Sequence, residues 1–325
     1  MEALTEVPPQ VSVVIATKDR SALLARVLGC MQRQTLPNFE VIVVDDGSSP
    51  EVVESYPLIW RDLDDRFRLQ LNPPGGGPGG TRNAGIRLAR GEFVAFCDDD
   101  DTWVRDDHLE TALEALNRFD GDVYIVNMRT SINGSIIASD FYGKGGQILK
   151  RFPLNAEGTI FDVRKGDIAR FLHHRILHAN TLIIRRQLIV DIGLYWDRIV
   201  IGEDLNLAFR LADNARRILY CTEVAAEGDA SPSQSLSRRT SPEASAFSMM
   251  SGLLHAQFFV RDSRLRRTAR RLRAAWMVRL SVLLLADGKR RSALEIVIES
   301  LMISARPTGF LQLAKCLFRL PSRRP

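Results

Sequence analysis

The sequence predicts an α/β protein with a doubly wound, mostly parallel sheet, helices on both faces of that sheet, and a helical region toward the C-terminal end. Two observations lead to this prediction. Apolar runs rich in β-branched residues alternate with helix-like segments over the first hundred residues, which is typical of βαβ units in a sheet buried on both faces. From about residue 245 to near residue 319 the pattern is helical, with expected breaks at 286–288 and 306–309.

The alternation can be followed along the chain. Expected strands cover residues 11–17, 40–47, 66–72 and 92–100, and expected helices cover residues 21–34, 51–60 and 82–90. The glycine- and proline-rich stretch NPPGGGPGGTRNAG (72–85) is expected to form a loop. After residue 119 the pattern indicates a strand at 123–130, irregular or hairpin structure at 131–165, a helix at 203–212 and a last strand at 217–223.

Composition divides the chain into four expected regions. They are an N-terminal tail (1–10), an α/β domain (11–225), a mobile loop or lid (226–245) and a basic helical region (246–325). The loop is expected because its residues are small, polar and include prolines. The 325 residues, 45% of them apolar and 26% charged, suffice for one large domain with an appendage.

Targeting and metal-binding signals are weak. The start MEALTEVPPQ is unlike a secretory signal, and residues 280–286, the longest apolar stretch toward the C-terminal end, are far fewer than the ~20 that cross a bilayer. A cytoplasmic location is therefore expected. The four cysteines and five histidines show no metal-ligand spacing. For His173, His174 and His178, which precede the segment leading to Asp204, a surface or packing role is favoured over acceptor binding.

Four consecutive aspartates follow an apolar strand in AFCDDDDTW (95–103). Adjacent carboxylates repel one another, so such a run needs a cation or a proton to be tolerated. Strand alternation would point Asp98 and Asp100 to one side, where both could bind one Mg²⁺ or Mn²⁺ whose shell is completed by substrate phosphates. The simpler alternative is a solvated acidic turn that caps a helix starting near Arg105.

Two further motifs fall near the same edge of the expected sheet, where α/β proteins bind ligands. The glycine-rich loop would bring Arg82 to the mouth of the sheet, where a guanidinium suits a diphosphate; a surface arginine on a flexible loop is the alternative. Asp46, in the motif Asp45-Asp46-Gly47-Ser48, can accept hydrogen bonds from a ribose or a base edge. Helix N-capping by Asp46 or Ser48 explains that motif equally well.

Taken together and in order, four stretches closely resemble the successive motifs of the family-2 glycosyltransferases with the GT-A fold. These stretches are VSVVIATKDR, EVIVVDDGSS, GGTRNAGIRLARGEFVAFCDDDDTW and IGEDLNLAFRLA, over roughly residues 10 to 215. The resemblance implies a nucleotide-diphosphate-sugar donor, a Mn²⁺ or Mg²⁺ cofactor and inversion at the anomeric carbon. Carried over position by position, it assigns donor binding to Thr17, Asp46, Arg82 and Asp99, metal binding to Asp98 and Asp100, and the catalytic base to Asp204.

The expected function is transfer of one sugar, with a UDP-sugar favoured, to a saccharide or lipid-linked acceptor in bacterial polysaccharide or glycolipid synthesis. Two other functions stay open: a nucleotidyltransferase that uses the same metal site, and a non-catalytic nucleotide-sugar-binding protein. Lys18 and Asp19 depart from the family's usual aromatic and Asn. The loop also lacks the His that the family often places there as a further metal ligand. Either Asp229 makes that contact with the metal or no residue does. Without the resemblance, the preferred interpretation of Asp204 is an acidic residue in the first turn of a helix, where the helix dipole favours negative charge.

A basic segment lies near the C-terminal end. Residues 248–325 hold 16 Lys and Arg against 4 Asp and Glu, whereas the first 247 residues hold 28 against 35. Apolar residues recur at helical spacing beside the arginines: Leu265, Ala269, Leu272, Trp276 and Leu280. Three roles are weighed for this helix: packing on the body, which is favoured, peripheral attachment to an anionic membrane surface at the inner face of the cell membrane, and nucleic-acid binding, which is the least favoured.

Overall fold

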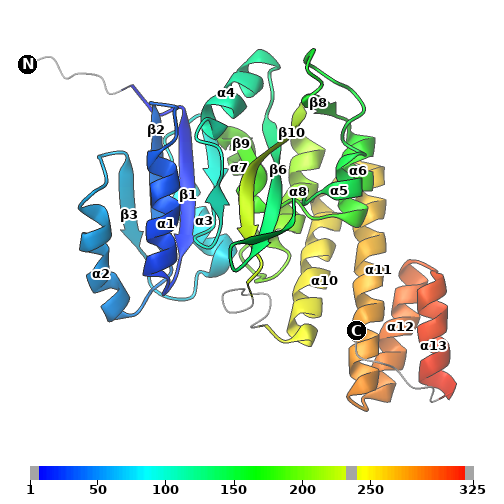
Figure 1. Ribbon diagram of the computed structural model, residues 1–325. Helices are drawn as coiled ribbons and strands as arrows, with labels where there is room; N and C mark the ends of the chain where they lie inside the picture. Colours follow the sequence, from blue (N-terminus) through cyan, green and yellow to red (C-terminus); the bar gives the residue numbers. More distant parts are fainter. Residues whose placement is uncertain (1–6, 232–239, 319–325) are drawn as a thin grey trace, which may run out of the picture.

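The computed structural model describes residues 7–231 and 240–318. Its centre is a ten-stranded sheet with helices on both faces (Figure 1). The strands follow the order β3-β2-β1-β4-β9-β6-β10-β5, with β7 beside β6 and β8 beside β10. Their bounds are β1 (Val11–Thr17), β2 (Phe39–Asp45), β3 (Phe67–Leu71), β4 (Phe93–Phe96), β5 (Thr102–Trp103), β6 (Val123–Ile132), β7 (Ser135–Ala138), β8 (Ile160–Val163), β9 (Leu182–Arg185) and β10 (Ile218–Asp229).

Strand direction in the sheet is mixed. β3, β2, β1 and β4 run parallel, and β6 pairs with β10 in parallel. Between these groups lies β9, which is antiparallel to both of its neighbours. Because β1, β2 and β4 are parallel and adjacent, their carboxyl ends meet at one edge, where α/β sheets bind ligands.

The helices cover both faces of this sheet and continue beyond it. Their bounds are α1 (Ser21–Gln32), α2 (Pro50–Trp60), α3 (Gly77–Leu88), α4 (His108–Arg118), α5 (Gly143–Gly146), α6 (Lys165–His174), the 3₁₀ helix η1 (Ala179–Thr181), α7 (Arg186–Asp191), α8 (Glu203–Asn214), α10 (Pro242–Phe259), α11 (Ser263–Ala286), α12 (Arg290–Ile303) and α13 (Pro307–Phe318). None of these helices combines the length and apolar character needed to cross a bilayer.

Two apolar cores explain why the strands read as continuous apolar runs. Neighbouring residues of β1 point to opposite faces: Val14 belongs to one buried cluster, while Val13 and Ile15 belong to the other. All three side chains are at most 1% exposed. The sheet is therefore buried on both faces, as the sequence predicts.

The apolar stripe of the basic helix packs on the body of the protein. Leu265 and Ala269 of α11 are fully buried in the core that also holds Val14, and Leu272 and Trp276 pack against that core. Figure 1 shows α11 beside α10 and α6, with α12 and α13 against the far end of α11. The stripe is thus used for packing, and the arginines between its residues lie at the surface or partly buried.

Local structure departs from expectation in the glycine-rich segment and in the C-terminal helices. The segment at residues 72–85 is not all loop, because α3 begins at Gly77, with Pro78 in its first turn where a missing N–H costs nothing. The long C-terminal helix is interrupted once more than expected, between Phe259 and Ser263. This additional interruption had a signal in the sequence, namely Asp262. Asp262 caps α11 by accepting hydrogen bonds from the backbone N–H groups of Arg264 and Leu265 at 2.8 and 3.1 Å.

The region expected as hairpin or irregular structure contains a hairpin. β6 and β7 are joined by Asn133 and Gly134, both in the left-handed region with φ of 49° and 77°. An Asn-Gly pair is the usual sequence of such a two-residue turn. The expected loop at 226–245 overlaps regular elements at both ends, since β10 continues to Asp229 and α10 begins at Pro242; residues 232–239 lie outside the described residues.

The contact between α3 and β1 can be tested at Gly85. A β-carbon there would lie 2.4 Å from Cγ1 of Val14, which is too close for any real contact. We expect Gly85→Ala to lower the free energy of unfolding by roughly 1–3 kcal/mol, because the buried strand leaves little room to shift. Urea unfolding measures the change.

Gly29 provides a matched control, since it also lies inside a helix. A β-carbon at Gly29 would meet only the Arg33 guanidinium, at 3.9 Å. Gly29→Ala should be neutral or stabilising by up to about 1 kcal/mol through helix propensity. Equal effects of the two substitutions would contradict a tight α3–β1 contact.

Candidate functional site

The candidate site lies at the carboxyl ends of β1, β2 and β4. β1 ends at Thr17, β4 ends at Phe96 just before the aspartate run, and α8 begins nearby with Glu203. Gly202, before α8, has φ of +89°, and a β-carbon there would lie 2.3 Å from Sδ of Met249 on α10. The turn that carries Glu203 and Asp204 therefore needs glycine for its backbone conformation and for the close approach of α10.

Arg82 occupies the centre of the site. Its Nη2 donates to both carboxylate oxygens of Asp98, at 2.7 and 2.9 Å, and its Nη1 lies 3.2 Å from Glu203 and 3.8 Å from Asp204. The side chain is 5% exposed and also lies over the ring of Tyr195. Burial alone would lower the pKa of Arg82, but Asp98 and Asp204 hold it well above its ordinary value.

The two acids at the start of α8 differ in their partners. Glu203 pairs with Arg82, while burial and the neighbouring Asp204 raise the pKa of Glu203 to about 7. Oδ2 of Asp204 accepts a hydrogen bond from the backbone N–H of Ala179 at 3.2 Å. Oδ1 of Asp204 accepts no hydrogen bond from any described residue, and burial raises the pKa of this carboxyl, with Arg82 opposing the shift. The free hydrogen-bonding capacity of Asp204 is therefore at Oδ1, the buried oxygen that lies 3.8 Å from Nη1 of Arg82.

The aspartate run is a turn and not a strand end, so the expected alternation is wrong. β4 stops at Phe96, and the N–H of Asp101 donates to the carbonyl of Asp98 at 3.0 Å. A turn of this kind brings its first and fourth residues together, so Asp98 groups with Asp101 and not with Asp100. The alternative of a solvated acidic turn is also wrong, because Asp99 and Asp101 are only 3% and 4% exposed.

Arginines and one hydroxyl relieve the repulsion within this turn. Arg20 Nη1 lies 2.8 Å from Asp99 and 3.1 Å from Asp100. Thr17 donates its hydroxyl proton to Asp99 at 2.8 Å, and burial still raises the pKa of Asp99 to about 6. Thr17 and Asp99, both assigned to donor binding, are therefore in direct contact. Asp100 is turned toward Arg20.

A group that could bind a metal ion forms from Asp98, Asp101 and His178. One ligand atom from each lies within 4.8 Å of the others, and Asp101 Oδ2 is 3.7 Å from Nδ1 of His178. These last two atoms are buried and have no hydrogen-bond partner among the described residues. Two carboxylates and one imidazole suit a divalent cation such as Mn²⁺, so this set fits the implied metal. Sequence reasoning missed His178, because it lies far along the chain from the acidic run.

Asp46 lies next to the start of α3. Its carboxylate accepts hydrogen bonds from the backbone N–H groups of Gly76 and Gly77, at 2.7 and 3.2 Å, and Lys18 donates to its carbonyl at 3.0 Å. Asp46 is therefore a capping residue, but for the N-terminal amides of α3 and not for the helix that follows it in sequence. Through this contact it fixes the glycine-rich segment that precedes Arg82.

Comparisons with known proteins identify the family of this chain. The model of the family described as Glycosyl transferase family 2 matches residues 12–176, just over half of the chain. The chain is 33% identical over 164 residues to the GalNAc(5)-diNAcBac-PP-undecaprenol beta-1,3-glucosyltransferase of Campylobacter jejuni, an alignment that covers 48% of this chain and 52% of that protein. It is 38% identical over 104 residues to the succinoglycan biosynthesis protein ExoW of Rhizobium meliloti, covering 31% of this chain and 32% of ExoW.

A solved structure shares the fold over nearly the whole chain. Residues 1–349 of S. aureus TarS, in complex with UDP-GlcNAc, superpose with a TM-score of 0.69 at 18% identity. The superposition covers 94% of this chain and 90% of the TarS chain. The chain spans about a third of the length of ExoW and about half of the length of the Campylobacter glucosyltransferase.

The role of Arg82 in holding the site together can be tested by stability. Arg82→Met leaves Asp98, Glu203 and Asp204 without their shared cation, and breaking a buried ion pair costs roughly 3–5 kcal/mol. Without Arg82 the pKa values of Glu203 and Asp204 should rise further in the folded state, so the deficit should grow with pH. Urea unfolding of variant and wild type in EDTA, at about pH 5.5 and about pH 8, measures the difference in free energy of unfolding.

Arg82→Lys is the control for charge. It keeps the positive charge but loses the planar guanidinium that reaches Asp98 through Nη2 and Glu203 through Nη1, so its deficit should be smaller and less dependent on pH. A Met variant as stable as the wild type at both pH values would show that Arg82 does not organise these carboxylates.

Proposed function

Because the chain belongs to glycosyl transferase family 2 and has the GT-A fold, we propose that it transfers one sugar from a nucleotide-diphosphate sugar to an acceptor hydroxyl, with inversion at the anomeric carbon. One observation carries this proposal: Arg82 joins the carboxylate of Asp98 in the aspartate turn to Glu203 and Asp204 at the start of α8. A donor-binding motif and a candidate base are thereby held around one buried cation. The UDP-GlcNAc complex of TarS supports a nucleotide-diphosphate sugar as donor.

We assign donor binding to Thr17, Asp46, Arg82 and Asp99. The direct contact between Thr17 and Asp99 supports a shared role near the nucleoside, with Asp99 accepting from the ribose. Asp46 binds the start of α3 at the same edge of the sheet, where we place it near the nucleoside. Arg82 offers a guanidinium whose donors suit the diphosphate. A uridine nucleotide is the favoured donor class.

The implied metal is Mn²⁺ or Mg²⁺, and Asp98 belongs to both candidate ligand sets. The family motif adds Asp100, whereas the geometry adds Asp101 and His178. The unpartnered atoms of Asp101 and His178 support the second set, while Asp100 would first have to leave Arg20. When bound, the cation would offset the negative charge that builds on the departing diphosphate.

Asp204 is the proposed catalytic base. The acceptor hydroxyl must lose its proton as it attacks the anomeric carbon, and a carboxylate on the face opposite the leaving group can take that proton. Asp204 Oδ1 has no hydrogen-bond partner among the described residues, and the N–H of Ala179 orients the other oxygen. Burial raises the pKa of Asp204, which strengthens it as a base. Glu203, paired with Arg82, helps position the guanidinium.

The acceptor is proposed to be a saccharide or a lipid-linked saccharide in polysaccharide or glycolipid synthesis. The names of ExoW and of the Campylobacter glucosyltransferase support this class. Peripheral attachment to an anionic membrane surface is proposed as well. The exposed arginines of α11 support it, as do Phe310 and Leu311 of α13, which are 56% and 59% exposed. Sedimentation with anionic vesicles at low salt tests the attachment, and a protein left in the supernatant would rule it out.

A donor screen tests the function and identifies the metal ligands. We expect one class among UDP, GDP, dTDP and CMP sugars to raise the melting temperature, and to do so only with Mn²⁺, because ligand binding to the folded state stabilises it by mass action. Asp101→Asn should abolish the metal-dependent part if the geometric set binds the ion. Asp100→Asn should do so if the family set binds it.

Product analysis separates the remaining functions. Release of a nucleoside diphosphate supports glycosyl transfer, whereas release of pyrophosphate from a nucleoside triphosphate would indicate a nucleotidyltransferase. Binding of a donor without turnover of any acceptor would favour a non-catalytic binding protein. No stabilisation by any donor would overturn the donor site as assigned.

The base assignment predicts a selective loss of turnover. Asp204→Asn should lower kcat by roughly 10²–10⁴-fold, because general base catalysis is worth about that much, while donor affinity is retained. Glu203→Gln is the matched neighbour and should cost less. Steady-state kinetics on the identified donor, including its hydrolysis, measure both. A Glu203→Gln variant that loses more activity than Asp204→Asn would move the base to Glu203.

A further inference from the structure

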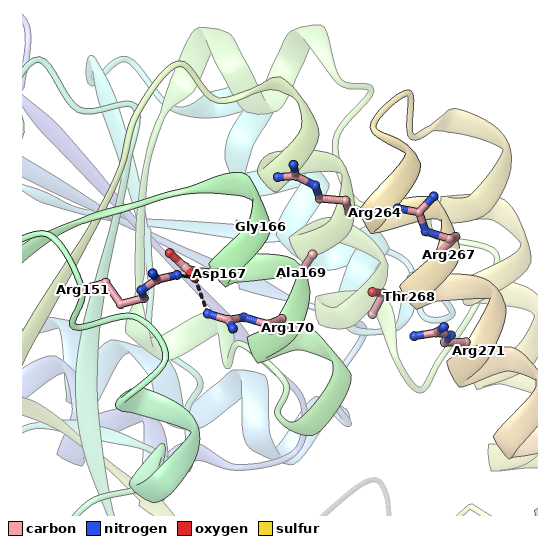
Figure 2. A pocket seen from close by; sticks show the side chains of 9 residues that line it. All are labelled: Arg151, Gly166, Asp167, Ala169, Arg170, Arg264, Arg267, Thr268 and Arg271. Atoms are coloured by element: carbon pink, nitrogen blue, oxygen red, sulfur yellow. Dashed lines mark hydrogen bonds and ion pairs between the residues drawn. The ribbon is translucent and has the colours of Figure 1, made fainter.

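A basic cleft lies between α6 and α11, outside the candidate active site. Its volume is about 360 Å³, near the lower end of the ~300–1,000 Å³ typical of small-molecule pockets. Figure 2 shows the lining residues, which are Arg151, Gly166, Asp167, Ala169, Arg170, Arg264, Arg267, Thr268 and Arg271. Five arginines thus face one carboxylate, which leaves the cleft strongly cationic.

The single carboxylate orients two of these arginines without neutralising the rest. Asp167 is buried, and its Oδ1 accepts hydrogen bonds from Arg151 at 2.9 Å and from Arg170 at 2.6 Å. Both arginine side chains remain more than half exposed, at 54% and 59%. Their remaining N–H groups are therefore free to bind a second anion.

The wall formed by α11 carries three arginines on one helical face. Arg264, Arg267 and Arg271 are spaced three and four residues apart, are exposed, and form no ion pair with any described residue. Like charges at this spacing destabilise a helix unless an anion offsets them. Figure 2 shows Arg264 and Arg271 reaching from α11 toward α6. Gly166 makes room for this, since a β-carbon there would lie 3.1 Å from Nη1 of Arg264.

We propose that this cleft is a binding site for a phosphate or diphosphate group, carried by a lipid headgroup or by a soluble phosphate ester. Planar guanidinium groups bind phosphate oxygens through paired hydrogen bonds, and the Thr268 hydroxyl adds a neutral donor. Two walls from α6 and α11 can hold such a group from both sides. The site is separate from the donor site, because no cleft residue belongs to the group around Arg82.

The test uses the whole 325-residue chain and two probes. The first is inorganic diphosphate, titrated calorimetrically in EDTA, and the second is phosphatidylcholine vesicles prepared with and without phosphatidic acid. The variant is Arg267→Gln/Arg271→Gln. The matched control is Arg270→Gln/Arg291→Gln, which removes two exposed charges outside the cleft. Melting temperatures confirm that both double variants fold.

We expect the cleft variant to weaken binding at least tenfold while the control stays near wild type. Loss of diphosphate binding supports the site with a soluble ligand, and loss confined to phosphatidic acid vesicles supports it with a lipid ligand. Failure of the wild type to bind either probe, or equal weakening in both variants, would overturn the proposal. So would diphosphate binding that Arg82→Lys weakens and the cleft variant does not, because the diphosphate would then occupy the donor site.

Discussion

The structure of the site depends on one buried positive charge. Arg82 is almost fully enclosed, and a lone guanidinium in such a place would be very costly. Three carboxylates from two distant parts of the chain offset this cost, and each of them would be unfavourable without Arg82. The end of β4 and the start of α8 are therefore held together by electrostatic attraction as well as by the packing of the sheet.

The same balance explains the high pKa values around the site. Burial raises the pKa of Asp99 to about 6 and that of Glu203 to about 7, and a second cation, Arg20, is needed beside the aspartate turn. Such a group of partly compensated acids is prepared to accept further positive charge or protons. A phosphate-bound divalent cation and an acceptor hydroxyl would supply both. Under the proposed function, the site would gain from its substrates a compensation that the protein alone does not provide.

Much of the fold could be predicted from the sequence, because apolar periodicity reports burial directly. Val13, Val14 and Ile15 are all apolar because both faces of β1 are covered. The stripe of α11 could be found, but whether it met the body or a membrane could not, since both surfaces select the same apolar residues. The start of α3 at Gly77 was missed because glycine predicts a loop, whereas here Gly77 takes a positive φ of 61° at the start of a helix, and Gly85 lets that helix approach β1 closely.

The site was predicted in part, and the errors have physical reasons. Motif resemblance singled out Thr17, Arg82, Asp99 and Asp204, and the structure brings Thr17 to Asp99 and Arg82 to Asp204, while the roles assigned to them stay predictions. Side-chain direction in the aspartate run was wrong because one backbone hydrogen bond, from Asp101 to Asp98, converts a strand end into a turn. His178 carries no local signal at all. Only the three-dimensional arrangement places its ring beside Asp101.

The close approach of α10 to Gly202 means that the C-terminal helices support the site by direct contact. With no side chain between Gly202 and Met249, the turn before Asp204 rests directly on α10, which in turn packs along α11. A ligand or surface that binds α11 therefore also affects, through α10, the turn that carries Asp204. Conversely, a chain cut before α10 would leave this turn open to water on one side.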